Sequence, residues 1–163
     1  MAAHRATISI SASVLPDDMK AAIGGTVTYD LNDIGDNNKW IYFANNVSTT
    51  AQPLMADGVS FLAGDAGDET AVVDVSADDL GFLVLKHSGF QGDGTTVSTD
   101  NLYLNTVDGT AASGNAGDLI LEPGDIWWGR FVNTDVEAIS VDAAGNTIKL
   151  LIYAILDDGG VGV

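Results

Sequence analysis

Two stretches near the C-terminal end of this chain decide its fold, LILEPGDIWWGRFV at residues 119–132 and LLIYAIL at residues 150–156. The first holds two of the three tryptophans, and the second has no charged side chain. A strand with one face in water alternates apolar and polar residues, because successive side chains point to opposite faces. Residues 150–156 do not alternate, so both faces of that strand must be covered. The sequence therefore predicts more apolar strand surface than a lone sandwich buries, which favours association of identical copies.

A reverse turn precedes the paired tryptophans. Residues 122–125 read Glu-Pro-Gly-Asp, and Pro at the second position with Gly at the third predicts a type II turn. In the strand that follows, Trp127, Gly129 and Phe131 share one face, and Ile126, Trp128 and Arg130 share the other. A large aromatic ring remains outside whichever face is the core. Either a loop of the same chain covers it, or it contacts a neighbouring copy, since interfaces favour Trp, Tyr and Arg.

The rest of the chain indicates an all-β fold. Residues 5–14 alternate cleanly, with Ile8 and Ile10 on one face and Ser or Thr on the other. Further short apolar segments are separated by Gly, Asp, Asn, Ser and Thr, whereas parallel strands need long crossover connections. We expect an antiparallel β-sandwich or jelly-roll-like barrel of about eight to ten short strands, with at most one short helix near residues 17–23. Residues 1–14 are expected to form an N-terminal strand or arm, and residues 15–163 a single β-sandwich domain.

The charge is strongly negative, with 23 acidic against 6 basic residues and a formal net charge of −17. Such a chain should be repelled by nucleic acid and by anionic membrane surfaces, because both attract cations. There is no cysteine, and no apolar stretch approaches the roughly 20 residues of a membrane helix. We therefore predict neither a nucleic-acid partner nor a membrane partner.

Catalytic and metal sites are not indicated. Residues 30–35 have some of the spacing of a calcium loop, but its fifth and twelfth positions are Ile34 and Ile41, which offer no side-chain oxygen. His4 and His87 are the only nitrogen ligands, and no thiol is available for zinc. Neither histidine accompanies a recognisable nucleophile motif. The prediction is a protein that is no enzyme and that needs no catalytic residue, metal or other cofactor.

In style, the whole chain resembles the head decoration, or cement, proteins of tailed bacteriophages. The features that carry the resemblance are the alternating N-terminal strand, the Ser/Thr/Gly/Asp-rich loops, the turn and strand at Leu121–Arg130, and the closing Leu150–Leu156 strand followed by an acidic end. The resemblance implies a β-rich protein, often trimeric, that is made in the host cytoplasm and sits on the capsid exterior at junctions between major capsid subunits.

We therefore expect a structural virion protein that decorates and stabilises the shell as a homo-oligomer, with a trimer favoured and the major capsid protein as its partner. The expected interface residues are Ile8, Ile10, Trp127, Trp128, Arg130 and Tyr153. The alternative is a carbohydrate-binding module of a phage tail, baseplate or fibre, in which Trp40 or Trp127 would contact sugar. A third hypothesis is an adhesin-like surface domain of a halophile.

Overall fold

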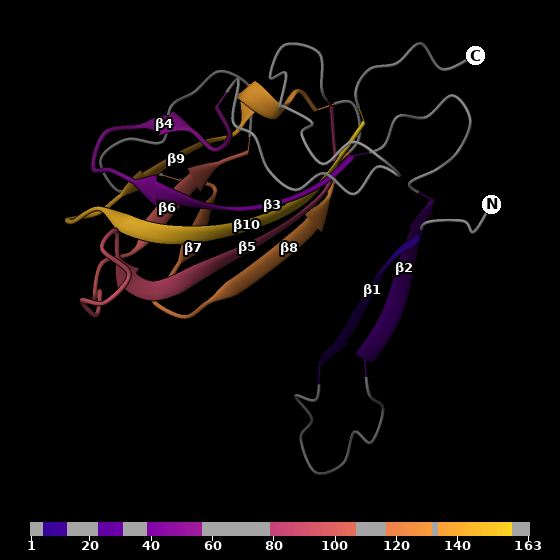
Figure 1. The fold of residues 1–163 in the computed structure, drawn as a ribbon, viewed down its shortest axis with the longest axis horizontal. Helices are drawn as coiled ribbons and strands as arrows, with labels where there is room; N and C mark the ends of the chain where they lie inside the picture. Colours follow the sequence, from indigo (N-terminus) through magenta and orange to yellow (C-terminus); the bar gives the residue numbers. More distant parts are fainter. Residues whose placement is uncertain are drawn as a thin grey trace.

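A computed structural model describes residues 5–12, 23–30, 39–56, 79–106, 117–131 and 134–157 of the chain. Within these residues the protein is mostly antiparallel β-structure, and its one helical element is a short 3-10 turn (Figure 1). In chain order the elements are β1 (Arg5–Ala12), β2 (Ile23–Asp30), β3 (Lys39–Val47), β4 (Gln52–Pro53), β5 (Asp79–Gln91), β6 (Leu102–Asn105), β7 (Leu119–Leu121), β8 (Ile126–Arg130), η1 (Val136–Ala138), β9 (Ser140–Ala143) and β10 (Ile148–Asp157).

Strands β3 to β10 form two four-stranded sheets that lie against each other (Figure 1). The large sheet has the order β3-β10-β5-β8, and the small sheet has the order β4-β9-β6-β7. Every described ladder in them is antiparallel. In this order the first and last strands of the sandwich, β3 and β10, pair with each other, and the chain passes repeatedly from one sheet to the other. This is the strand order of a jelly roll. The expected all-β sandwich is therefore confirmed, but the described ladders stay within each sheet and close no barrel.

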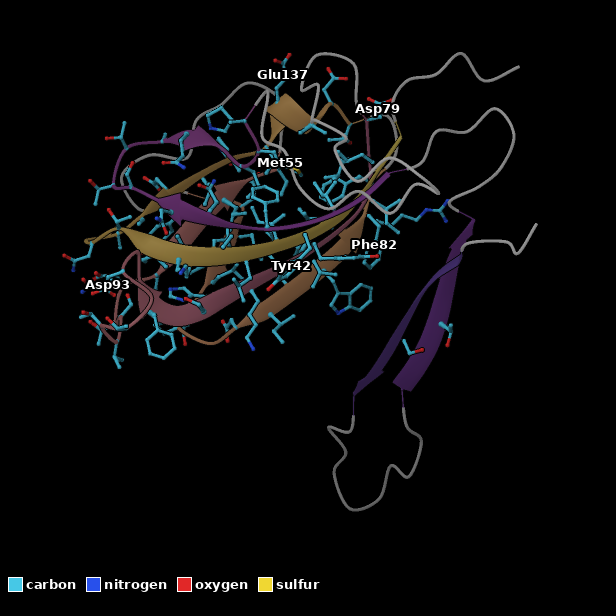
Figure 2. The ribbon with its side chains drawn as sticks, in the orientation of Figure 1. Tyr42, Met55, Asp79, Phe82, Asp93 and Glu137 are labelled. Carbon is cyan, nitrogen blue, oxygen red and sulfur yellow. The ribbon has the colours of Figure 1, made fainter. Side chains whose placement is uncertain are left out.

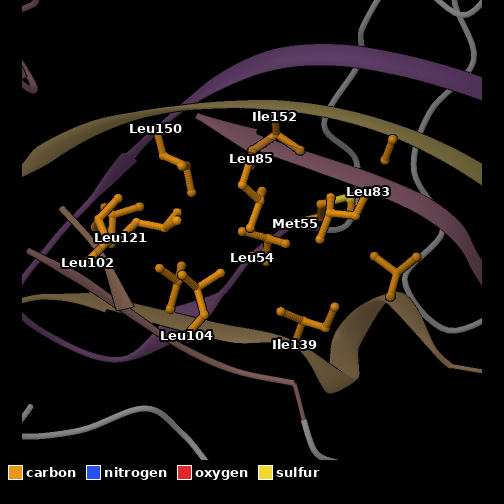
Figure 3. Close-up of a cluster of buried hydrophobic side chains, with 14 of the residues drawn as sticks. Leu54, Met55, Leu83, Leu85, Leu102, Leu104, Leu121, Ile139, Leu150 and Ile152 are labelled. Atoms are coloured by element: carbon orange, nitrogen blue, oxygen red, sulfur yellow. The ribbon is translucent and has the colours of Figure 1, made fainter. Parts of the chain in front are cut away.

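The hydrophobic core fills the space between the two sheets (Figure 3). Strand β10 contributes alternate residues, and Leu150, Ile152 and Ala154 are completely buried. From the small sheet, Leu102 and Leu104 point inward and are buried, whereas Tyr103 between them is only partly buried. Burying a side chain of this size typically stabilises a protein by roughly 1.5–3 kcal/mol, so this layer of aliphatic residues holds the sheets together.

The turn at residues 122–125 carries the chain from the small sheet to the large one. Asp125 donates its backbone N–H to the carbonyl of Glu122 at 2.9 Å, and Gly124 has a φ of 94°. That positive φ follows the Pro123 position, as the predicted type II turn requires. The carboxylate of Asp125 also accepts the backbone N–H of Glu122 at 3.0 Å. The turn therefore links β7 to β8 and fixes where the tryptophan pair enters the large sheet.

Strands β1 and β2 form an antiparallel sheet of their own, which Figure 1 shows apart from the sandwich. The expected boundary after residue 14 thus falls between two paired strands, and the expected arm has a second strand, 23–30. The short helix expected near 17–23 lies outside the described residues except for Ile23, which begins β2. Among the residues that the structure describes, no helix has the length and apolar character needed to cross a membrane.

Candidate functional site: the outer face of the large sheet

The side of the large sheet that points away from the core carries a continuous apolar surface. Tyr42, Tyr153, Val84 and Trp128 lie side by side in one row across its four strands. The next row toward one end contains Trp40, Ile155, Phe82 and Arg130, and the next row toward the other end contains Ala44, Leu151, Lys86 and Ile126. We call these twelve positions, together with Lys149 in the row beyond, the outer face.

The outer face presents large apolar side chains to solvent. Tyr42 is 55% exposed, Trp128 46% and Ile126 60%. Phe82 and Ile155 are buried, although neither belongs to the core cluster between the sheets. Figure 2 shows Tyr42 and Phe82 on this sheet. Contiguous exposed apolar patches of this kind mark interaction sites on proteins more often than isolated apolar residues do.

The two adjacent tryptophans divide between the two faces of β8. Trp127 packs against the core cluster, where its ring lies 6.0 Å from the ring of Phe131 at an interplanar angle of 59°. Trp128 points outward and stacks on Phe82, with ring centroids 6.3 Å apart and an interplanar angle of 20°. The predicted division of residues 126–131 between two faces is therefore what the structure shows. The ring that remains outside is Trp128.

Gly129 makes room for the inward tryptophan. A Cβ atom at this position would lie 2.5 Å from Cη2 and 2.9 Å from Cζ2 of the Trp127 ring. Real Cβ atoms do not approach other atoms so closely, and a side chain here would push the ring off the core. The sequence Trp-Trp-Gly therefore allows one ring to fold over its own strand while the other stays on the outer face.

The polar residues of the outer face are mostly cations, in contrast to the rest of the chain. Lys86 pairs with Ile126, Arg130 pairs with Phe82, and Lys149 lies on the same side of β10 as Leu151 and Tyr153. These are three of the six Lys and Arg residues in the sequence. The nearest acidic residues in the strand register are Asp79 and Asp157, which pair with each other in the row beyond Phe82 and Ile155. An apolar centre with Tyr, Trp and Arg and a polar rim is typical of protein–protein interfaces.

Tyr153 lies at the middle of this surface. It pairs in register with Tyr42 and Val84 on the neighbouring strands. Burial raises the pKa of its phenol above 10.0, because the charged phenolate loses hydration there. The face therefore presents a neutral tyrosine between its aromatic neighbours over the physiological pH range.

His87 is a structural histidine. It is completely buried within β5. Its Nδ1 accepts the backbone N–H of Gly89 at 3.0 Å, so its Nε2 carries the proton and donates to the carbonyl of Asp100 at 2.9 Å. Both ring nitrogens are thus occupied by backbone groups, and neither is free to serve as a general base or metal ligand.

Two aspartates between β5 and β6, Asp93 and Asp100, organise loops. Asp93 accepts the backbone N–H groups of Thr95 and Thr96, each at 2.8 Å, and the hydroxyl of Thr96 at 2.5 Å. Asp100 accepts the backbone and side-chain N–H groups of Asn146, at 2.9 and 2.7 Å. In the part of the chain that the structure describes, no three His, Cys, Asp or Glu side chains gather as a metal site would require.

The six predicted interface residues do not form one surface. Trp128, Arg130 and Tyr153 share the outer face, whereas Trp127 lies on the core side of β8. Ile8 and Ile10 belong to β1, in the separate two-stranded sheet, opposite Val27 and Gly25. The prediction omitted Tyr42, Phe82 and Ile155. The sequence does show that the segments around these residues are apolar at adjacent positions. It does not show which residues they pair with on the neighbouring strands.

Comparisons of the chain with protein-family models, with curated proteins and with solved structures found no match.

Proposed function

We propose that this protein is a structural virion protein that decorates and stabilises the capsid shell of a tailed bacteriophage as a homo-oligomer, with a trimer favoured. The observation that supports this most is the outer face, an exposed apolar sheet surface on a compact sandwich. The jelly-roll strand order also fits, because this architecture recurs in viral capsid domains.

A decoration protein needs adhesive surfaces rather than a pocket. The eight-stranded sandwich is a rigid domain. Its outer face is an apolar surface that another protein can cover. The β1–β2 hairpin supplies a second element outside the sandwich that can reach a neighbouring subunit. Edge strands of such hairpins can pair with strands of another chain. A net charge of −17 would keep decorated particles apart in solution.

The half-exposed aromatic row favours one alternative, a carbohydrate-binding module of a phage tail or fibre. Jelly rolls also occur as lectin domains, and Tyr42 and Trp128 could stack on sugar rings. Sugar sites combine such rings with carboxylates and amides that bind hydroxyl groups. The outer face instead offers Lys86 and Arg130 in the rows next to the rings, and the carboxylates of its strand register, Asp79 and Asp157, come two rows away. Decoration is therefore the better-supported function.

Co-sedimentation of the purified protein with empty heads of the phage that encodes it tests the proposal. We expect the protein to pellet with the heads in a saturable manner, in a copy number proportional to the number of capsid subunits. A variant lacking residues 1–14 should bind less. Binding to tails alone, at a few copies per particle, or binding to glycans on an array without binding to heads would contradict the proposal.

A further inference from the structure

We infer that the β1–β2 hairpin of one copy of this chain lies on the outer face of a second copy, with the apolar side of the hairpin against the apolar centre of that face. This inference deepens the proposed function, because it names the contact that holds the homo-oligomer together, and it rests on that function for its role on a capsid shell. The contact itself is argued from the register of the hairpin, the side chains of the outer face and the charges of both.

The hairpin has one polar side and one apolar side. Ser9 and Thr26 are a cross-strand pair whose hydroxyl oxygens lie 3.4 Å apart, and both residues are exposed. Because successive residues of a strand belong to opposite faces, the pairs next to this one lie on the other side. The register of β1 with β2 places four pairs there, Ala6–Tyr29, Ile8–Val27, Ile10–Gly25 and Ala12–Ile23. That side of the hairpin therefore contains no charged residue.

A hairpin of this kind needs a surface that covers it. Two isolated strands are marginally stable at best in water, and an apolar side becomes stable when it packs on another layer. The hairpin is a two-stranded sheet of its own, and Figure 1 shows it extending away from the sandwich of its own chain. The covering surface is therefore expected on another molecule.

The outer face fits the hairpin in length and in character. By the rise of an extended strand, β1 extends over about 25 Å and the outer-face positions of β10, from Lys149 to Ile155, over about 20 Å. Tyr42, Ile126 and Trp128 are about half exposed on this face. Sheets that pack face to face bring such side chains together in one layer about 10 Å thick. The hairpin would thus remove from water the apolar residues that the sandwich itself leaves exposed.

The charges also favour this pair of surfaces. Copies with a formal net charge of −17 repel each other, so contact is favoured where that charge is absent. The described strands of the hairpin carry one cation and one acid, Arg5 and Asp30, which pair with each other. The outer face carries cations, and its nearest acidic pair, Asp79 and Asp157, lies beyond its apolar rows. A neutral hairpin on this face therefore adds little like-charge repulsion between two acidic copies.

Cross-linking between two variants of the full chain tests the contact, and the chain has no cysteine of its own. Ile8→Cys places a thiol on the apolar side of the hairpin, and Ile126→Cys places one on the outer face. At about 100 µM, a concentration that populates complexes of micromolar affinity, a short bis-maleimide should link the two variants into mixed pairs. A size tag on one chain identifies these pairs on a denaturing gel. The control mixture of Ile8→Cys with Thr50→Cys, at an exposed site outside the outer face, should give at least about tenfold fewer mixed pairs, because thiols held in a contact have an effective concentration in the millimolar range.

Three results of this experiment would overturn the inference. Links between two Ile126→Cys copies that outnumber the mixed pairs would mean that two outer faces meet each other. Links that form only within one chain, in the double variant Ile8→Cys, Ile126→Cys, would mean that the hairpin covers its own sandwich. The absence of links in the mixture would mean that the two surfaces do not meet.

A matched pair of hairpin variants tests the apolar side by sedimentation at the same concentration. Ile8→Thr, Ile10→Thr should weaken association at least about tenfold, because both changes reduce the apolar area that the contact buries. The control Ser9→Thr, Ser11→Thr alters the polar side of the same strand and should associate as the wild type does. Trp128→Ser leaves the hairpin intact and should also weaken association at least about tenfold, as expected for an interfacial tryptophan.

A wild type that stays monomeric, or equal association of the two hairpin variants, would refute the contact. The proposed function is tested separately by binding to heads. Assembled copies that do not bind heads would refute the proposed function alone. Head binding by a wild type whose hairpin and outer face give no cross-links would refute this inference alone.

Discussion

Single residues hold the loops of this protein in place, and Asp93 is the clearest case. Hydrogen bonds from Thr96 and Thr95 stabilise its carboxylate and lower its pKa from 3.8 to about 2. Because the folded-state pKa lies below the unfolded one, this contribution to stability is present above pH 3.8 and is lost as the pH falls through about 2. Asp93 is thus a structural residue in a loop whose composition alone also fits a cation site.

We predict that the Asp93 carboxyl titrates in the folded protein with a midpoint near 2, as carbon-detected NMR would show. Thr96→Val removes the hydroxyl donor and should raise that midpoint toward 3.8. Thr96→Ser keeps a hydroxyl and should leave it low. A midpoint that is the same in all three proteins would show that these hydrogen bonds do not control the titration.

Gly129 gives a second prediction at the residue scale. Gly129→Ala places a methyl group into the Trp127 ring, and overpacking of this kind typically destabilises a protein by about 1–3 kcal/mol. Urea unfolding monitored by tryptophan fluorescence would measure the loss. Gly81→Ala is the control on the adjacent strand, because its new Cβ lies 3.4 Å from the nearest atom, the carbonyl oxygen of Ile155. An unchanged free energy of unfolding for Gly129→Ala would mean that the Trp127 ring is not held over this glycine.

At the scale of elements, the two faces of β10 explain why its sequence does not alternate between apolar and polar residues. Its register with β5 shifts between Ile155 and Leu156, where Gly81 adds an extra residue to β5. On one side of this bulge, Leu80 and Leu156 join the core cluster, while Phe82 and Ile155 remain on the outer face. The bulge lies in β5 and leaves the alternation of β10 intact, so the apolar run of β10 has one cause, a sheet that is apolar on both sides.

The two faces of β10 should respond differently to truncation. Leu150→Ala opens a cavity in the core and should cost about 2–5 kcal/mol of the free energy of unfolding. Leu151→Ala, at the next position on the outer face, should cost clearly less in the monomer, since Leu151 is only partly buried. Chemical denaturation at low protein concentration would compare them. Equal losses would show that the outer face is as well covered as the core.

Tyr153 provides a titration that reports on the outer face. Because burial raises its pKa above 10.0, its neutral form is favoured by folding, and this stabilisation is lost as the pH rises through the raised value. In an absorbance titration at alkaline pH, Tyr153→Phe should remove a phenol that ionises late in the wild type. The loss of an early-titrating phenol instead would show that Tyr153 is open to water.

At the scale of the whole molecule, the sandwich and the β1–β2 hairpin are separate sheets. All residues of the core cluster lie between Ile41 and Leu156. We predict that a variant lacking residues 1–30 keeps the cooperative thermal unfolding of the sandwich, with a melting temperature within a few degrees of the full chain. Differential scanning calorimetry would test this. Loss of the cooperative transition would mean that the hairpin is part of the sandwich fold.

Local sequence determined much of this protein. The alternation at 102–104, the Pro-Gly turn at 122–125 and the division of residues 126–131 between two faces all follow from the pleat of a strand and from restricted φ values. These properties depend on residues that are neighbours in the chain. They were therefore predictable, as was the all-β class.

Tertiary structure decided the rest. The strand order places Tyr42, Tyr153, Val84 and Trp128 in one row, although they come from four segments far apart in the sequence. It also chose Trp127 for the core and Trp128 for the outer face, and it separated Ile8 and Ile10 from both. The physical reason is that cross-strand neighbours and the buried side of a strand are set by long-range pairing and by the closing of one core, which no local pattern contains.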